Sequence, residues 1–354
     1  MKNNVVIVSN MYPSLEDPAY GSFVREQSEE LEKRNVKIKR IVSYDRAEGD
    51  KKRALLKYFS LWGRTLLSAF NPRNKMYHFH YVFPTAIVAP ILKYVFRKKV
   101  VFTYHGSDLL KGGAKKDKLM SKLLNSADEI ILVSDYLQKE FIKRFPQHSP
   151  HSHSIHCGVN NKLFYPQDKE QVTKKLQLPQ DKFNILFLGR IINDKGIDVF
   201  EKVIDNLKDV DDFHFIVVGD GKDKGKLQEK YAHLYNVSFH PSIPKNEVPL
   251  WFNAADVFVF PTKREAFGLV ALESTACGTP VITHSVGGVP EIIKDNQSGF
   301  LVNLGDNDDF SRKILELYES PALKNTFSIN GFNNSKEHTI EKQIDKILNV
   351  YNTL

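Results

Sequence analysis

The feature that most constrains the fold is an alternation of short β-rich segments with longer helical ones, which runs through the chain twice. The β-rich segments of the first half are NVVIVSN, KIKRIVS, KMYHFHYV, KVVFTYHG, EIILVSD and SHSIHCG. The alternation restarts at FNILFLGR (183–190) and continues with FHFIVVGD, NVSFHPS, VFVFPT and TPVITHS. Strands connected through helices form parallel sheets that helices cover on both faces. The pattern therefore predicts an α/β fold with two doubly wound domains in tandem.

The join between the predicted domains falls near NKLFYPQD (161–168), after the last β-rich segment of the first half. We therefore assign residues 1–165 to an N-terminal domain and 166–337 to a C-terminal domain. In the final stretch, apolar side chains recur at helical spacing, at Ile340, Ile344, Ile347, Leu348 and Tyr351. This spacing predicts an amphipathic helix over about 338–354 that packs back on the N-terminal domain.

Charge is distributed unevenly along the chain, whose net charge is +8. Residues 1–165 contain 28 lysines and arginines against 15 acidic residues, whereas the remainder contains 22 against 27. A basic half is attracted to anionic lipid headgroups, nucleic acid or a phosphorylated substrate. A merely well-solvated surface is the alternative interpretation.

Two stretches of the basic half combine lysine and arginine with apolar residues. Residues 50–76 include Leu, Phe and Trp62 and predict a helix pair, and KGGAKKDKLMSKLL (111–124) predicts a loop followed by a helix. Segments of this composition can lie on a membrane surface. The alternative is a packed helix with a solvated basic face.

The sequence favours a cytoplasmic location. The longest apolar run, YVFPTAIVAPIL (81–92), is shorter than the roughly 20 residues that span a bilayer and contains two prolines. The first residues lack the apolar core of a signal peptide. Cys157 and Cys277 lie too far apart to suggest a metal clasp, and a chain of this length needs no disulfide. Contact with the inner face of the plasma membrane is left open.

Two cations follow the first strand of the second predicted domain. FLGRIINDKG places Arg190 and Lys195 just beyond its carboxyl end, where open parallel sheets bind ligands. A departing diphosphate needs such groups, because its developing charge must be neutralised in the transition state. Taken alone, the pair is also compatible with a solvated turn.

Two glutamates flank a glycine in FVFPTKREAFGLVALESTACG. The segment reads as a strand, a loop with Glu265, and a helix that begins near Phe267 or Gly268 and contains Glu273. The N-terminus of this helix favours an anion, and Gly268 allows a phosphate to approach the backbone. Carboxylates on either side of such a position accept hydrogen bonds from hydroxyl groups. We therefore expect both glutamates at a ligand site and not in the core.

Together these motifs resemble the retaining GT-B glycosyltransferases of family four, which use nucleotide-sugar donors. The resemblance rests on EAFGLVALE with the upstream Arg190 and Lys195, and it extends over nearly the whole chain. The other matching segments are YPSLEDPAYGSFVREQSEEL, YHGSD, ADEIILVSD, VVGDG, AADVFVFPT and VGGVPEII.

The resemblance implies a role for each candidate residue. Glu265 would bind hydroxyls of the donor sugar, Glu273 the ribose, and Arg190 and Lys195 the diphosphate. The backbone amides of Phe267, Gly268 and Leu269 would contact the phosphates, and Gly21 would contact the diphosphate from the N-terminal domain. His105 would face the transferred sugar. The base would lie against the backbone near Ser242 and Ile243. His105 can also be a satisfied histidine at a strand end. Tyr20-Gly21-Ser22 replaces the two adjacent glycines of many members, and HPSIP departs from the usual glycine near the base.

No catalytic metal or other cofactor is expected. DVD (209–211) and DND (306–308) have the Asp-x-Asp spacing of metal-dependent glycosyltransferases, but both are predicted in polar turns away from the carboxyl ends of strands. The histidines of HSPHSHSIHC (148–157) lack a zinc spacing and are expected to be solvated. VVGDGKDKGK matches neither glycine-rich phosphate motif and predicts a strand-to-helix turn.

The sequence thus predicts a retaining, metal-independent hexosyltransferase for surface polysaccharide synthesis. The donor, most often UDP-linked in this family, would bind the C-terminal domain. A saccharide or lipid-linked acceptor would bind the N-terminal domain. Closure of the two domains would exclude water. In this family the leaving phosphate is described as taking the acceptor proton, although Glu265 and Asp108 remain conceivable as nucleophile or base. An epimerase of the same fold and a non-catalytic membrane-docking module are the alternatives. We expect no nucleic-acid partner.

Overall fold

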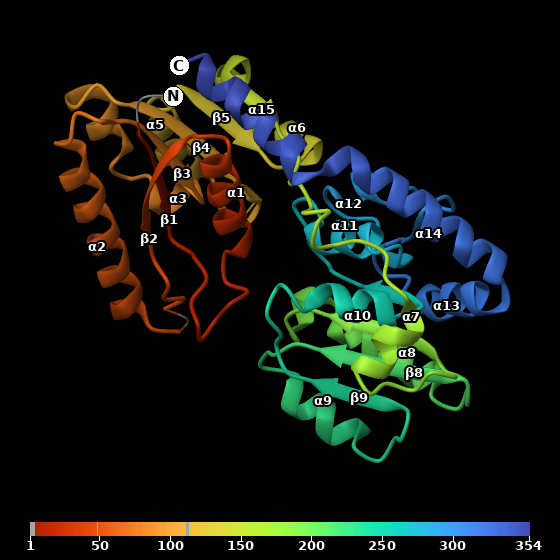
Figure 1. Ribbon diagram of the computed structural model, residues 1–354. Coiled ribbons are helices and arrows are strands. Elements are labelled where there is room, and N and C mark those ends of the chain that lie inside the picture. Colours follow the sequence, from red (N-terminus) through yellow and green to blue (C-terminus); the bar gives the residue numbers. More distant parts are fainter. Residues whose placement is uncertain (1–3, 48, 111–112) are drawn as a thin grey trace. The chain divides into compact units, whose positions relative to one another are not determined.

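The computed structural model describes residues 4–47, 49–110 and 113–354 (Figure 1). The chain divides into two compact units. Unit 1 contains Met1–Cys157 and Ile340–Leu354, and unit 2 contains Gly158–Thr339. Residues 111 and 112 of the predicted basic cluster at 111–124 lie outside the described residues.

Unit 1 is built on a six-stranded parallel sheet in the order β2-β1-β3-β4-β5-β6. Its strands are β1 (Asn4–Ser9), β2 (Lys37–Val42), β3 (Asn74–His80), β4 (Lys99–Tyr104), β5 (Glu129–Leu132) and β6 (Ser152–Ser154). The helices of its first part are α1 (Ser22–Lys33), α2 (Lys51–Ala69), α3 (Val82–Thr85), the π-helix η1 (Ile91–Val95), α4 (Ser107–Leu110), α5 (Ala114–Leu124), α6 (Asp135–Arg144) and the 3₁₀ helix η2 (Pro146–His151).

Unit 2 repeats the architecture in the order β12-β11-β10-β7-β8-β9, again with parallel pairing. Its strands are β7 (Phe183–Leu188), β8 (Phe213–Val218), β9 (Val237–His240), β10 (Val257–Phe260), β11 (Val281–His284) and β12 (Gly299–Val302). Its helices are α7 (Lys169–Lys175), η3 (Asn193–Lys195), α8 (Ile197–Leu207), α9 (Lys224–Tyr231), α10 (Val248–Ala254), α11 (Leu269–Ala276), α12 (Val289–Ile292), α13 (Asp309–Glu319), α14 (Pro321–Ser335) and η4 (Lys336–His338).

The two sheets confirm the predicted fold class of two Rossmann-like domains. The central strands form because they are short runs rich in β-branched and aromatic residues that are buried on both faces, as β8 is throughout. The outer strands differ: β2 alternates between exposed and less exposed residues, and β9 is half-buried. The helices bury one apolar stripe each: in α8 the buried residues are Ile197, Val199, Phe200, Val203, Ile204 and Leu207.

Each sheet has a point at which the strand order reverses. This point lies between β1 and β3 in unit 1 and between β7 and β10 in unit 2. The connections that leave neighbouring strands there go to opposite faces of the sheet, so a crevice opens beyond the carboxyl ends. The topology therefore marks one candidate ligand position in each unit.

The last helix, α15 (Ile340–Asn352), belongs to unit 1. It returns to the sheet after the whole of unit 2, and it contacts α1. Its apolar stripe joins the core of unit 1 through Ile340, Ile344, Ile347, Val350 and Tyr351. The chain thus crosses between the units twice, after Cys157 and after Thr339.

Two sequence-based expectations need correction. The helix pair predicted over 50–76 is a single helix, α2, which Asp50 caps by accepting hydrogen bonds from the backbone N–H groups of Lys52 and Arg53. The strand β12 was not expected at all. Within the described residues, no helix is long and apolar enough to cross a membrane.

Candidate functional site

The cations predicted after the first strand of unit 2 lie where its strand order reverses. β7 ends at Leu188, and Arg190 and Lys195 follow it, the first exposed and the second about one-third exposed. Gly196 ends this turn with φ +78°, and a Cβ at that position would lie 1.9 Å from the backbone oxygen of Pro261. Only glycine therefore allows the turn after β7 to lie directly on the segment after β10.

This close approach brings Glu265 to Lys195. Their Oε2 and Nζ atoms are 2.9 Å apart, and the Glu265 side chain is 20% exposed. The Glu265 backbone is fixed from the other side by Gly287, where a Cβ would lie 1.7 Å from the Glu265 oxygen. Lys195 and Glu265, which come from two separate sequence motifs, are thus in direct contact beyond the carboxyl ends of β7 and β10.

The N-terminus of α11 lies next to this ion pair. Gly268 caps the helix in the left-handed conformation, with φ +101°, and α11 begins at Leu269, one or two residues later than expected. N–H groups in the first turn of a helix have no acceptor within the helix, so they favour an anion. Phe267 is buried, at 2% exposure, which anchors the loop before the helix.

Glu273 is a core residue by exposure, contrary to the expectation above. It is 4% exposed in the second turn of α11. Its carboxylate forms an ion pair with Lys245, whose side chain is 13% exposed and whose ammonium lies 5.2 Å from the centre of the Phe164 ring. The carboxylate is tolerated in the core because a cation compensates its charge there.

Lys245 was missed by sequence reasoning. It lies in the segment 241–247 between β9 and α10, which also contains Ser242 and Ile243. The backbone N–H of Ser242 donates to Asp220, at 2.7 Å, so Asp220 and Glu273 hold this segment at two points. A single lysine in a polar loop has no pattern that distinguishes it from a solvated one.

Unit 2 thus presents cations, carboxylates and a helix N-terminus together. The cations and helix N–H groups can bind a diphosphate, and the carboxylates can accept hydrogen bonds from hydroxyl groups. Every predicted donor-site residue of this unit belongs to the segments after β7, β9 and β10 or to α11.

In unit 1, His105 follows β4 and is enclosed by aromatic rings. Its ring is 4.8 Å from those of both Tyr81 and Phe23, and it is stacked on Tyr81 with an interplanar angle of 27°. Its Nε2 is 3.0 Å from Nδ1 of His80, the last residue of β3. Burial, followed by the nearby His80, holds the pKa of His105 well below its ordinary value.

Asp108 holds the backbone around His105 in place. Its Oδ1 accepts from the N–H groups of His105 and Gly106, at 3.1 and 3.0 Å, and its Oδ2 accepts from that of Val82 at 3.0 Å. Burial raises the pKa of this carboxyl to about 6. Because backbone donors occupy both oxygens, the geometry does not favour Asp108 as a nucleophile or base.

Gly21 caps α1 in the left-handed conformation, at φ +73°. A Cβ there would lie 2.8 Å from the backbone carbon and oxygen of Met11. The glycine therefore keeps the start of α1, with Phe23, close to the segment after β1. Gly21 and His105 thus belong to the region of unit 1 where its strand order reverses.

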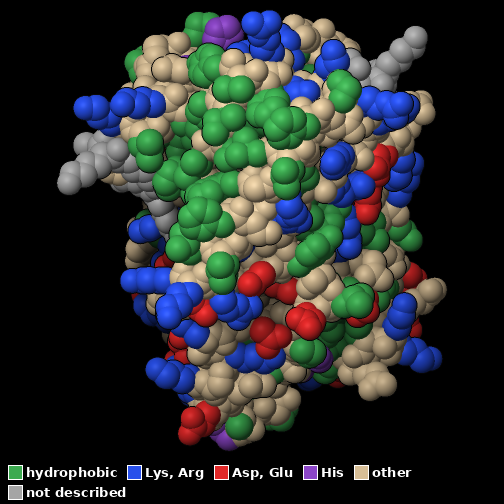
Figure 2. Space-filling view, turned by 90° about the vertical axis from the view of Figure 1, so that its left-hand side faces the viewer, with side chains coloured by type: hydrophobic (Ala, Val, Ile, Leu, Met, Phe, Trp, Pro, Cys, Tyr) green, Lys and Arg blue, Asp and Glu red, His purple; other side chains and the backbone are tan. Residues whose placement is uncertain are grey.

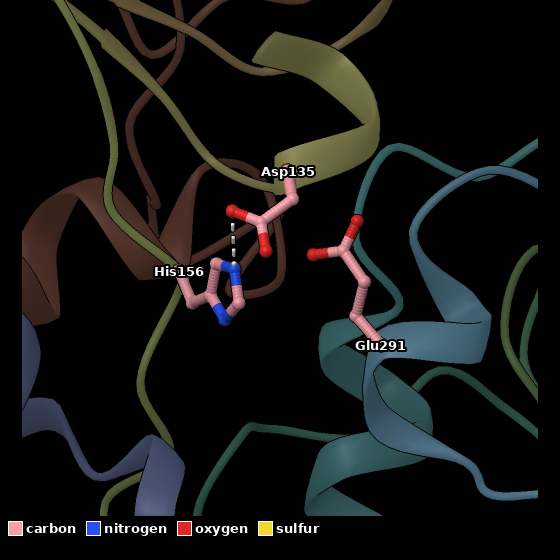
Figure 3. A group of neighbouring side chains, drawn as sticks. All are labelled: Asp135, His156 and Glu291. Carbon is pink, nitrogen blue, oxygen red and sulfur yellow. Dashed lines mark ion pairs between the residues drawn. The ribbon is translucent and has the colours of Figure 1, made fainter. Parts of the chain in front are cut away.

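The possible metal ligands need two corrections. DND (306–308) follows the carboxyl end of β12, an edge strand that the sequence reading overlooked, and Asp308 pairs there with Lys202 at 2.7 Å. Three histidines expected to be solvated have other environments: His148 is buried, His153 pairs with Glu129 at 2.7 Å, and His156 pairs with Asp135 at 3.3 Å (Figure 3). DVD (209–211) precedes β8, as expected for a turn away from the carboxyl edge.

Comparison with known families covers both halves of the chain. The profile of Glycosyltransferase Family 4 matches residues 5–163, and that of Glycosyl transferases group 1 matches residues 168–334. An uncharacterized glycosyltransferase of Methanocaldococcus jannaschii is 29% identical over 98% of this chain and 93% of its own length. A D-inositol 3-phosphate glycosyltransferase of Streptomyces bingchenggensis is 32% identical over 57% of this chain, which spans about half of that relative (48%).

Solved structures share the fold across the full chain. Sucrose-phosphate synthase from Thermosynechococcus elongatus has a TM-score of 0.84 at 21% identity, with 99% of both chains covered. HepE of Anabaena, solved with UDP and glucose, has a TM-score of 0.78 at 17% identity, covering 99% of this chain and 100% of its own.

Proposed function

We propose that this chain, which belongs to the GT-B glycosyltransferases of the group 1 and family 4 type, transfers a sugar from a nucleotide diphosphate to an acceptor hydroxyl with retention of configuration. The observation that carries the proposal is the contact of Lys195 with Glu265 beside the N-terminus of α11. In this arrangement a diphosphate would bind Arg190, Lys195 and the α11 N–H groups. Its sugar would then lie at Glu265.

The second ion pair supports a ribose position. Glu273 lies one helical turn beyond the first residue of α11, and Lys245 forms an ion pair with its carboxylate within the core. A carboxylate held this way accepts hydrogen bonds from two vicinal hydroxyls more strongly than a neutral acceptor does. Ile243, in the same segment as Lys245, would contact the base. We propose UDP as the nucleotide, in line with the UDP bound to HepE.

The mechanism that fits these residues is transfer on one face of the sugar. The bond from the anomeric carbon to the diphosphate oxygen breaks, and the acceptor oxygen forms a bond to the same carbon. The acceptor proton passes to the departing phosphate, so no protein nucleophile is needed. Arg190, Lys195 and the helix N–H groups stabilise the negative charge that develops on the diphosphate. We therefore propose that no metal ion is required.

Product analysis tests the proposed function against an epimerase of the same fold. The protein would be incubated with UDP-glucose labelled in the sugar and with D-inositol 3-phosphate, the compound in the name of one group of relatives, or with a lipid extract as acceptor. Transfer predicts free UDP and label in a new sugar conjugate with the α-configuration. Label that stays on the nucleotide as a different sugar would support the epimerase, and a β-configured product would contradict retention.

We also infer that unit 1 binds an anionic membrane that contains its acceptor. From residue 51 to residue 107 the chain has eleven lysines and arginines and no acidic residue. Figure 2 shows a broad apolar patch with basic side chains around it. The exposed large apolar residues of α2 and the segment that includes η1 are Leu55, Leu56, Phe59, Leu67, Phe70, Ile87, Ile91, Tyr94 and Val95.

The patch is continuous because α2 contacts η1. The rings that follow the two helices, Phe70 and Phe96, meet edge to face at 5.1 Å. A basic rim around exposed apolar side chains is the composition of an interfacial membrane surface, since apolar groups enter the headgroup region while cations bind anionic lipids. The packed helix with a solvated basic face, considered above, would instead keep Leu56 and Phe70 away from water, yet they are 69% and 73% exposed.

Sedimentation with vesicles tests this surface. The protein should sediment with phosphatidylglycerol vesicles and not with phosphatidylcholine vesicles, and the binding should fall with salt. Leu56→Glu should remove most of it, whereas Leu304→Glu, at a leucine of unit 2 with 59% exposure, should not. Equal effects of the two variants, or salt-independent binding, would refute the membrane surface.

A further inference from the structure

A hydrogen bond between two histidine rings connects the ends of β3 and β4. His80 Nδ1 and His105 Nε2 are 3.0 Å apart, and the rings are inclined by 25°. Their centres are 5.2 Å apart, which is close to the nitrogen separation plus the two ring radii. The hydrogen bond therefore runs almost along the line between the ring centres, nearly in both ring planes, which is the geometry of a strong N–H···N bond.

Only one of the two rings can supply the proton of this bond. His80 is fully buried, and burial lowers its pKa to about 3, while the pKa of His105 is also well below its ordinary value. Both rings are therefore neutral near pH 7, and a neutral imidazole has one N–H and one lone pair. The tautomer of one ring fixes that of the other.

The surroundings of His80 decide between the two tautomers. Its Nε2 is buried and has no hydrogen-bond partner among the described residues. A buried N–H without an acceptor is rarer in proteins than a buried acceptor without a donor. His80 Nε2 is therefore the unprotonated nitrogen, and His80 donates from Nδ1 to His105 Nε2.

We propose that His80 is a positioning residue that holds His105 in the tautomer with its proton on Nδ1, so that His105 acts as a hydrogen-bond donor. Nδ1 is the ring nitrogen of His105 for which the described residues provide no partner. Unlike His80 Nε2, it is not among the buried atoms without a partner, so water or a ligand can accept a hydrogen bond from it. Tyr81 and Phe23 restrict the ring plane, and Asp108 holds the backbone. The inference rests on the proposed function only in taking the acceptor of this N–H to be a hydroxyl of the transferred sugar.

His78 provides an internal control. It lies two residues before His80 on the same strand and is equally buried, but it bonds elsewhere: to Tyr351 through Nδ1 and to Thr103 through Nε2, both at 2.6 Å. It touches His80 only through a tilted ring contact, with centres 4.4 Å apart and an interplanar angle of 30°. Replacement of His78 removes a buried histidine of β3 without removing the donor to His105.

The first test reads the tautomer directly and needs no substrate. Nitrogen-15 NMR of the full chain with labelled histidine distinguishes protonated from unprotonated ring nitrogens, and His105→Gln assigns the signals. We expect a protonated Nδ1 and an unprotonated Nε2 for His105 in the native protein and in His78→Gln. A protonated Nε2 on His105, or an equal mixture of tautomers, overturns the proposal.

The second test measures the binding of UDP-glucose and of UDP by titration calorimetry. His80→Leu should weaken UDP-glucose about tenfold, the value of one hydrogen bond, and leave UDP unchanged. His80→Asn should restore most of the loss, because its amide nitrogen occupies the place of Nδ1. Equal losses for both ligands would show a structural role and contradict the proposal. If the native protein binds neither ligand, the proposed function fails, and the NMR result still decides the tautomer.

Discussion

The two units differ in the candidate side chains that follow the carboxyl ends of their strands: those of unit 2 are charged, and the histidine rings of unit 1 are neutral. Unit 2 places the ion pair Lys195–Glu265 where its strand order reverses, and a second pair, Lys245–Glu273, joins the segment after β9 to α11. Unit 1 places neutral rings at the corresponding point, with His80 and His105 joined by a hydrogen bond and both pKa values lowered by burial. Parallel topology therefore provides the position of a site, while the side chains after the strands decide whether it suits a charged or a neutral ligand group.

The charged region of unit 2 and the neutral region of unit 1 should respond differently to substitution. A buried cation and carboxylate compensate each other, so removal of one leaves the other unpaired. A neutral ring loses only a hydrogen bond and packing. Loss of one partner of the buried pair Lys245–Glu273 in unit 2 should therefore cost more stability than loss of one neutral ring in unit 1. The dependence of stability on pH should come mainly from the buried histidines of unit 1.

The largest expected effect is that of Glu265→Gln. The substitution keeps the size of the side chain but removes the charge that binds Lys195 and, as we propose, the donor sugar. Because this contact matters most in the transition state, turnover should fall by a factor of about 100 to 1,000 while binding of UDP is largely kept. Loss of cooperative unfolding in the variant would instead make Glu265 a structural residue.

Lys195→Met tests whether the lysine of the first ion pair binds the diphosphate. The loss of one charged hydrogen bond should weaken UDP by a factor of about 10 to 100, with little change for uridine, which lacks the diphosphate. The matched control is Lys202→Met, at a lysine that pairs with Asp308 after the edge strand. Similar losses for UDP and uridine in titration calorimetry would contradict a phosphate contact.

The neutral histidines of unit 1 predict a loss of stability in acid. The pKa of His80 is about 3 in the folded chain and near 6.5 when unfolded, so the unfolded state binds more protons between these values. Stability should fall as pH decreases through this window, by up to about 1.4 kcal/mol per pH unit for each such histidine. His78 and His105 act in the same direction.

Asp108 opposes this trend. Its folded pKa of about 6 exceeds the unfolded value of 3.8, so protonation favours the folded state between pH 6 and 4. Urea unfolding from pH 7 to pH 4 measures the balance, and we expect the histidines to prevail because there are three of them. In His80→Leu the slope should be smaller, and an unchanged slope would mean that His80 is charged in the folded chain.

The smallest effect concerns the backbone of unit 1. Gly21→Ala introduces a Cβ that would meet the Met11 backbone at 2.8 Å, at a positive φ, and should destabilise the chain by about 1 to 3 kcal/mol. Gly63→Ala, in the exposed interior of α2 with no atom within 4 Å of the added Cβ, should stabilise by about 0.5 to 1 kcal/mol. Thermal unfolding measures both effects. Equal shifts in the unfolding temperature of the two variants would show that the backbone at Gly21 and Met11 can move apart to accept a Cβ.

The fold was largely predictable because its central strands, such as β1 and β8, are uninterrupted runs rich in β-branched and aromatic residues. β12 was missed because it contains only GFLV, a four-residue segment between polar turns. The helix pair expected at 50–76 is one helix because an exposed glycine, Gly63, costs only about 1 kcal/mol and does not end it.

Residue type and spacing predicted Glu273 outside the core, which is wrong, and predicted a shared position after the strands for Lys195 and Glu265, which are in contact. Their proximity in unit 2 depends on close backbone approaches at Gly196 and Gly287. Lys245 could not be found, because a lysine in a loop carries no periodic signal. His80 was equally hidden, since HFH reads as the alternation of an ordinary buried strand.

We propose that unit 2 binds a nucleotide diphosphate through its cations without a metal. The decisive experiment is thermal unfolding with UDP, GDP, ADP or TDP, each with and without EDTA. A nucleotide present at 100 times its dissociation constant should stabilise the chain by about 2.7 kcal/mol. UDP should do so equally with EDTA present, and the stabilisation should be smaller in Lys195→Met. Stabilisation that EDTA abolishes, or none by any of the four nucleotides, would contradict the proposal.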